Sequence, residues 1–130
     1  MEILTQPEVE LDAGLLESLK TLHQEENQVI LHVHMKIPDP PIGIRIWPNT
    51  LLIPHGGGAK AKMIQSIGIS RAPQWMFVTR KSHVFTLIFE GLTKDCQLFD
   101  LVEDIPSPGR FQYLGISRNQ SDVYHLSMLG

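Results

Sequence analysis

The sequence predicts a mainly β protein, an antiparallel β-sandwich of immunoglobulin-like or similar type with one N-terminal amphipathic helix. From Val29 onward, short segments with apolar residues at every second position alternate with turns rich in proline, glycine, asparagine and serine. No alternation of strands with helices follows, so a parallel α/β sheet is not expected. A β-barrel is the alternative, because the same period-two pattern occurs in barrels.

A chain of 130 residues fits a single domain, residues 1–130. Within residues 1–28, leucines 11, 15, 19 and 22 recur at spacings that place them on one helix face. Asp12 is a suitable N-cap for a helix that continues to about Glu26. We therefore expect this N-terminal helical segment to pack on a β-sandwich formed by residues 29–130.

The clearest strand covers Val29 to Ile37, where every odd position is apolar and most even positions are polar. Val84 to Phe89 is almost continuously apolar and is expected in the middle of the core. Residues 75–80 and 84–90 are expected to form a hairpin. Residues 63–72 fit either a strand or a short helical turn. The other expected strands are residues 42–47, 50–53, 98–102, 110–117 and 122–128.

Composition argues against several classes of function. The net charge is −3, whereas nucleic-acid binders present a basic surface, so no nucleic-acid partner is expected. The single cysteine, Cys96, excludes an intrachain disulfide and suits a reducing compartment. Acidic residues near the N-terminus do not match a secretion signal, and no apolar run is long enough to cross a membrane. We expect a cytoplasmic protein without a membrane partner.

One combination of residues resembles a hydrolase site. His55-Gly56-Gly57-Gly58 matches the glycine-rich oxyanion loop of some esterases, and Ser70, Asp100 and His125 follow in the order of a catalytic triad. The spacing contradicts this interpretation, because the segment between Gly58 and Gly68 is too short for the intervening elements of that fold. No catalytic residue and no cofactor are predicted.

A ligand site is predicted around the loop from His55 to Lys62, whose Lys60 and Lys62 could attract an anion. Trp47 and Trp75 lie beside strand ends marked by proline and could frame a groove for the same ligand. The alternative role for the two tryptophans is to cap the ends of the core. The predicted ligand-binding residues are Trp47, His55, Lys60, Lys62 and Trp75.

A metal site is the second hypothesis. His32 and His34 are two apart in a strand, so both side chains project from the same face and could share an ion. His83 or His125 could supply a third ligand from a neighbouring strand. The alternative is that these histidines are ordinary surface residues.

The second half of the chain resembles conserved-hypothetical β-sandwich domains of bacteria, over the stretch from Ile44 to Tyr124. The resemblance is carried by residues 85–92, Cys96, residues 99–103, Arg118-Asn119 and residues 122–124. It implies a sandwich fold and a bacterial intracellular origin. It implies no activity, cofactor or site residue.

The leading functional hypothesis is a non-enzymatic module that binds another protein or a second copy of itself. The expected terminal strand, Asp122 to Met128, is apolar and has few charges that would prevent pairing with another strand. Its free edge predicts a homodimer. The alternative is a domain that binds a small ligand or a metal through the loop at residues 55–62 and the face of His32 and His34.

Overall fold

The computed structural model describes residues 27–130, and within them the chain forms nine strands and no helix. The predicted helix with its leucines 11 to 22 lies outside the described residues. The strands are β1 (Val29–Lys36), β2 (Ile42–Ile44), β3 (Thr50–Pro54), β4 (Ala61–Ile67), β5 (Met76–Val78), β6 (Ser82–Phe89), β7 (Leu98–Glu103), β8 (Gln112–Ser117) and β9 (Val123–Leu129).

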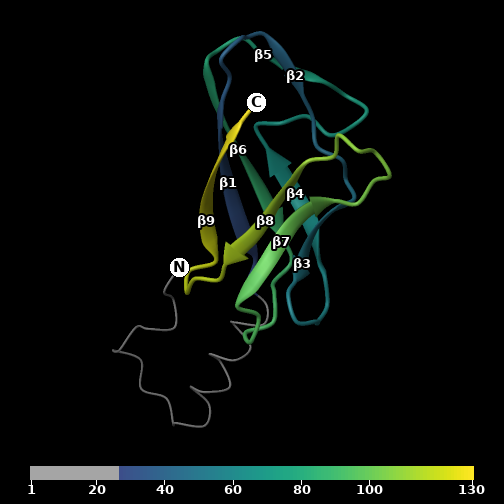
Figure 1. Ribbon diagram of the computed structural model, residues 1–130, viewed down its shortest axis with the longest axis vertical. Coiled ribbons are helices and arrows are strands. Elements are labelled where there is room, and N and C mark those ends of the chain that lie inside the picture. The colour runs from purple at the N-terminus through teal and green to yellow at the C-terminus, as the bar shows by residue number, and fades with distance from the viewer. Residues whose placement is uncertain (1–26) are drawn as a thin grey trace.

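Seven strands form one curled sheet in the order β8-β7-β3-β4-β6-β1-β9, and β2 and β5 form a separate two-stranded ribbon (Figure 1). The predicted sandwich of two separate sheets is therefore wrong. The sheet is continuous because β3 pairs with β7 on one side and, through Leu51 and Leu52, with β4 on the other. The shape is a half-barrel, since β8 and β9 end the sheet without pairing to each other in the described part of the chain.

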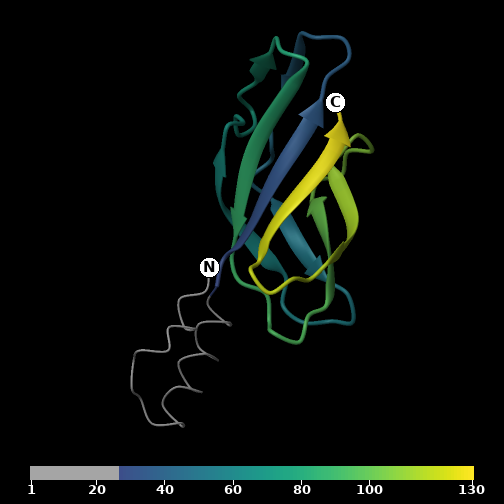
Figure 2. The same cartoon turned by 90° about the vertical axis from the view of Figure 1, so that its left-hand side faces the viewer.

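The sheet is also not purely antiparallel. β1 pairs antiparallel with β6 but parallel with β9, from Ile30 opposite Val123 to Lys36 opposite Leu129. Figure 2 shows β9 beside β1 with both arrows pointing the same way. The two strands are far apart in the sequence, so no tight turn forces them to run in opposite directions.

The core fills the concave side of the curled sheet. Val29, Leu31 and Val33 on β1 are fully buried, as are alternate residues of the adjacent β6. The ring of Phe99 on β7 lies 5.3 Å from that of Tyr124 on β9, centroid to centroid. Strands from opposite halves of the sheet thus enclose one core, and β6 lies between β4 and β1, which confirms the expected interior position of residues 84–89.

The expected hairpin of residues 75–80 and 84–90 is wrong. β5 pairs with β2, with Ile42 opposite Val78, whereas both edges of β6 are occupied by β1 and β4. Phe77 on β5 is 71% exposed. The ribbon of β2 and β5 lies near one end of the half-barrel (Figure 1).

A buried ion pair closes the connection between β8 and β9. The guanidinium of Arg118 binds both carboxylate oxygens of Asp122, at 2.6 and 2.9 Å, and also donates to the carbonyls of Leu92, Thr93 and Cys96. Burial disfavours the charged guanidinium, but the hydrogen bonds and charge of Asp122 outweigh it and raise the pKa of Arg118. The loop is therefore held by a charged group whose donors are satisfied inside the protein.

A candidate ligand pocket at one end of the half-barrel

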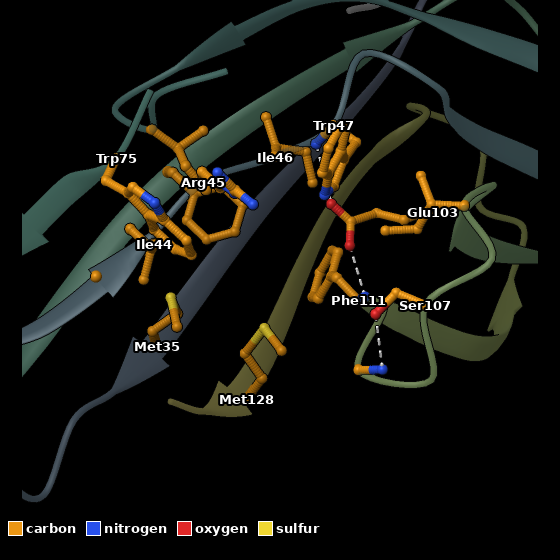
Figure 3. Close-up of a pocket in the computed structure, with 15 residues that line it drawn as sticks. Met35, Ile44, Arg45, Ile46, Trp47, Trp75, Glu103, Ser107, Phe111 and Met128 are labelled. Carbon is orange, nitrogen blue, oxygen red and sulfur yellow. Dashed lines mark hydrogen bonds between the residues drawn. The ribbon is translucent and has the colours of Figure 1, made fainter. Parts of the chain in front are cut away.

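A pocket of about 380 Å³ opens where β1, β7 and β9 end, beside the ribbon of β2 and β5 (Figure 3). Its volume lies in the range of small-molecule sites. Met35 and Met128 come from the ends of the parallel strands β1 and β9. Phe85 lies on β6, and Phe111 directly precedes β8. The surface that a ligand would meet is consequently mostly apolar.

Arg45 brings a positive charge to this apolar surface. Its guanidinium carbon lies 4.0 Å from the ring centroid of Trp75 and 5.1 Å from that of Trp47, so the cation sits against both indole rings. One terminal nitrogen donates to the carbonyl of Pro73 at 3.1 Å. Within residues 27–130 Arg45 forms no ion pair, so it brings an uncompensated cation to the pocket.

Gly43 allows Trp75 to approach the ribbon closely. A Cβ atom at position 43 would lie 3.2 Å from Cε3 of Trp75 and 3.3 Å from Cε1 of Phe77, which is tighter than ordinary packing. A side chain at position 43 would therefore displace the two rings by a few tenths of an ångström. Trp75 remains 53% exposed, so much of its surface is available for contact with a ligand.

Glu103, at the end of β7, supplies the other charge in the pocket lining. Its carboxylate accepts hydrogen bonds from the backbone amides of Trp47 at 3.0 Å and Phe111 at 2.7 Å. The side chain is almost completely buried, and the two amides compensate its charge. Glu103 thus holds the segments that carry Trp47 and Phe111, whereas Arg45 is the charge positioned to meet a ligand.

The structure separates the predicted ligand residues into two groups. Trp47 and Trp75 line the pocket, but His55, Lys60 and Lys62 lie on the β3–β4 connection and at the start of β4, and are not part of its lining. His55 instead bonds Asp100 at 2.8 Å. The backbone amide of Gly115 lowers the pKa of Asp100, and the hydrogen bond from His55 lowers it further, against the opposing effect of burial.

The residues that resemble a hydrolase triad do not assemble. Asp100 is bonded to His55 and not to His125, and His125 is bonded to His34 on the outer face of the sheet. Ser70 accepts from the backbone amide of Ile46 through its carbonyl, in the connection between β4 and β5. Ser70, Asp100 and His125 are therefore not joined to one another by hydrogen bonds in the described part of the chain.

The predicted histidine pair is extended by a third imidazole. His125 on β9 is directly opposite His32 on β1, with ring centroids 5.0 Å apart, and shares a 3.0 Å hydrogen bond with His34. Nδ1 of His32 bonds the hydroxyl of Thr86 at 2.8 Å. Partial burial lowers the pKa of His32, and the imidazoles of His125 and His34 lower it further.

This histidine cluster does not have the geometry of a three-ligand metal site. Among residues 27–130, no group of three or more histidine, cysteine, aspartate or glutamate side chains is arranged to hold a metal ion. Metal binding by His32 and His34 stays a prediction, for which two neighbouring imidazoles on an exposed face are the basis.

Sequence reasoning missed Arg45 and Glu103. Arg45 lies between two isoleucines and two residues before a tryptophan, and that placement of a cation among apolar residues was the available signal. Glu103 carried no comparable signal, because it precedes Asp104 and looks like a solvated acid. Its burial depends on amides from residues 47 and 111, which are distant in the sequence.

Comparisons with protein-family models, curated proteins and solved structures found no match to this chain. The resemblance of residues 44–124 to bacterial β-sandwich domains therefore stays an expectation. In the described part of the chain, no helix is long and apolar enough to cross a membrane.

Proposed function

We propose that this protein binds a small amphipathic anion, a molecule with one acidic group and an apolar body, in the pocket beside Trp47 and Trp75. The observation that carries the proposal is the Arg45 guanidinium held against two indole rings above an apolar pocket floor. An acidic group would pair with Arg45, and the apolar body would contact Met35, Met128 and the aromatic rings.

The chemistry of the pocket supports an anion over a neutral ligand. A guanidinium presents a planar set of donors that matches a carboxylate, and these charge-assisted hydrogen bonds strengthen where water is partly excluded. Glu103 does not cancel this preference, since its oxygens already accept two backbone amides. The apolar lining adds affinity through burial of the ligand's hydrocarbon surface.

The proposal describes a binding protein and not an enzyme. Among the residues of the described chain that line the pocket there is no cysteine or histidine, and the charged ones are Arg45 and Glu103. A cytoplasmic location belongs to the same proposal and is supported by Cys96, a buried free thiol.

The two tryptophans provide a direct assay. The chain contains two tryptophans, and both line the pocket, so its intrinsic tryptophan fluorescence reports on this site alone. Titration with dodecanoate below its micellar concentration should produce a saturable change in that fluorescence. Dodecanol, with the same apolar chain and no charge, should bind more weakly. Absence of a saturable change with either compound would contradict the proposed function.

Substitution of Arg45 tests the role of the charge. Arg45→Gln should weaken dodecanoate binding roughly tenfold or more, as expected for loss of a charge-assisted hydrogen bond. Dodecanol binding should change little. Arg80→Gln removes an exposed arginine outside the pocket and is the matched control. Equal losses for dodecanoate and dodecanol would show that Arg45 acts through packing and not through its charge.

A further inference from the structure

The outer edge of β9 presents unpaired backbone groups. The carbonyl of Asp122 accepts from Ile30, and the amide of Gly130 donates to Lys36 on β1. Because the register between β1 and β9 is continuous, the even-numbered residues of β9 direct their backbone toward β1. The odd-numbered residues direct their amides and carbonyls away from the sheet.

The available part of this edge is limited to residues 125–129. At position 123 the amide donates to the hydroxyl of Ser121 and the carbonyl accepts from the side chain of Asn119. His125, Ser127 and Leu129 each present an amide and a carbonyl that no partner within residues 27–130 occupies. The centre of this free segment is Ser127.

Nothing in the sequence of β9 protects this edge. Val123–Leu129 contains no charged residue and no proline, the two features that most often prevent strand pairing. Leu129 is 71% exposed. A regular, uncharged and apolar edge of this kind favours the addition of another strand.

The opposite edge of the sheet is irregular. The register of β8 against β7 shifts between Phe99 and Leu101. Gly115 has a positive φ of 72° and donates its amide to the Asp100 carboxylate. Bulges and twisted positions of this type prevent continuous pairing. Pairing between β8 of one molecule and β9 of another is therefore disfavoured. The remaining way for two copies to join at their sheet edges is for β9 to pair with a second β9.

We propose that two copies of this chain form a dimer by antiparallel pairing of their β9 strands about a two-fold axis at Ser127. In this register the outward amides of residues 125, 127 and 129 meet the carbonyls of residues 129, 127 and 125 of the second copy. All free backbone groups of the segment are then satisfied. An isologous contact of this kind closes after two molecules and does not propagate into a filament.

The side chains are compatible with this register. His125 would lie opposite Leu129 of the second copy, and Ser127 opposite its own counterpart. On the inner face, Leu126 would lie opposite Met128. No pair of like charges is created, which is the usual obstacle to a symmetric strand pair.

Sedimentation velocity of the full chain tests this proposal. The wild-type protein should shift from monomer to dimer as its concentration rises from micromolar to submillimolar. Ser127→Pro removes an amide that faces away from β1, so it should abolish the dimer and keep the β1–β9 hydrogen bonds. Ser127→Thr keeps that amide, favours a strand and should leave the dimer intact.

Leu129→Lys is the second variant, because it places a charge at the edge without altering the backbone, and it should also yield monomers. Circular dichroism establishes that each variant is folded. A wild-type protein that stays monomeric at all these concentrations overturns the proposal. Dimers that persist in a folded Ser127→Pro or Leu129→Lys variant overturn it equally.

Discussion

At the scale of single residues, the ion pair of Arg118 and Asp122 is the site where a substitution should cost the most stability. The two side chains are 13% and 5% exposed, and Tyr124 adds a hydrogen bond from its hydroxyl to the same carboxylate. Burial raises the pKa of Tyr124, and its bond to Asp122 contributes to the increase. Removal of either charge would leave the other without its partner inside the protein.

Replacement of Asp122 should therefore destabilise the protein strongly. We expect Asp122→Ala to lower the free energy of unfolding by about 3 kcal/mol or more, because Arg118 would be buried without a counter-charge. The positive φ of 56° at this position adds a further cost for alanine. Urea unfolding measures the change.

Asp122→Asn is the matched control, since asparagine has the same shape and tolerates a positive φ. It should lose less stability than alanine does. If Asp122→Ala unfolds at the same urea concentration as the wild type, the ion pair contributes nothing to stability.

At the scale of elements, the register between β1 and β9 creates a pH-dependent contact that neither strand has alone. His32 and His125 are neighbours across this pair, and the pKa of His32 is below its ordinary value of 6.5. Between the lowered pKa and 6.5, the unfolded chain binds more protons at this position than the folded protein does. Stability is therefore full above this window and decreases as the pH falls through it.

Urea unfolding between about pH 7.5 and about pH 5.5 should show this decrease, which spans the titration range of histidine. His32→Gln should reduce the dependence on pH most. His125→Gln should reduce it in part, because burial of His32 is the larger cause of the lowered pKa and persists in that variant. An unchanged dependence in His32→Gln would assign the effect to other groups.

The sequence predicted individual strands better than their partners. Period-two alternation in residues 29–37 located the whole of β1, and the apolar run at 84–89 located most of β6. Alternation identifies which face of a strand is buried, but it carries no information about the neighbour at each edge. The pairing of β5 with β2 and the parallel direction of β9 were missed for this reason.

At the scale of the whole molecule, the continuity of the sheet depends on few contacts. β3 and β4 pair through Leu51 opposite Lys62 and Leu52 opposite Ala61. Glu90, the residue after β6, binds Lys62 of β4 at this junction. Its carboxylate accepts a hydrogen bond from the amide of Lys62, and its own amide donates to the carbonyl of Lys62. Whether two halves of a β protein join at an edge depends on such local pairs, which alternation in the sequence does not reveal.

The sequence also predicted only part of the pocket. The two tryptophans were predicted as ligand contacts from their positions beside prolines, but the pocket is also lined by Met35 of β1, Met128 of β9 and Arg45, which follows β2. Met35 and Met128 lie side by side because β1 and β9 run parallel and end at the same side of the sheet. A site assembled in this way follows from the topology, and the topology was the part that the sequence predicted incorrectly.

The parallel pairing of the first and last described strands also has a mechanical consequence. Val29 begins β1 at one end of the strand pair, and Leu129 ends β9 at the other. Tension applied between these residues would load the β1–β9 hydrogen bonds in shear, so that they must break together. By contrast, Val29 and Phe89 are directly opposed, and pulling them apart would unzip β1 from β6 one pair at a time.

Single-molecule force spectroscopy with handles at residues 29 and 129 should therefore record a higher rupture force than with handles at residues 29 and 89. Similar forces in the two geometries would contradict this expectation. Under such tension, the β1–β9 pair would therefore carry the load. This is the same strand pair that holds the histidine cluster and the free edge of β9.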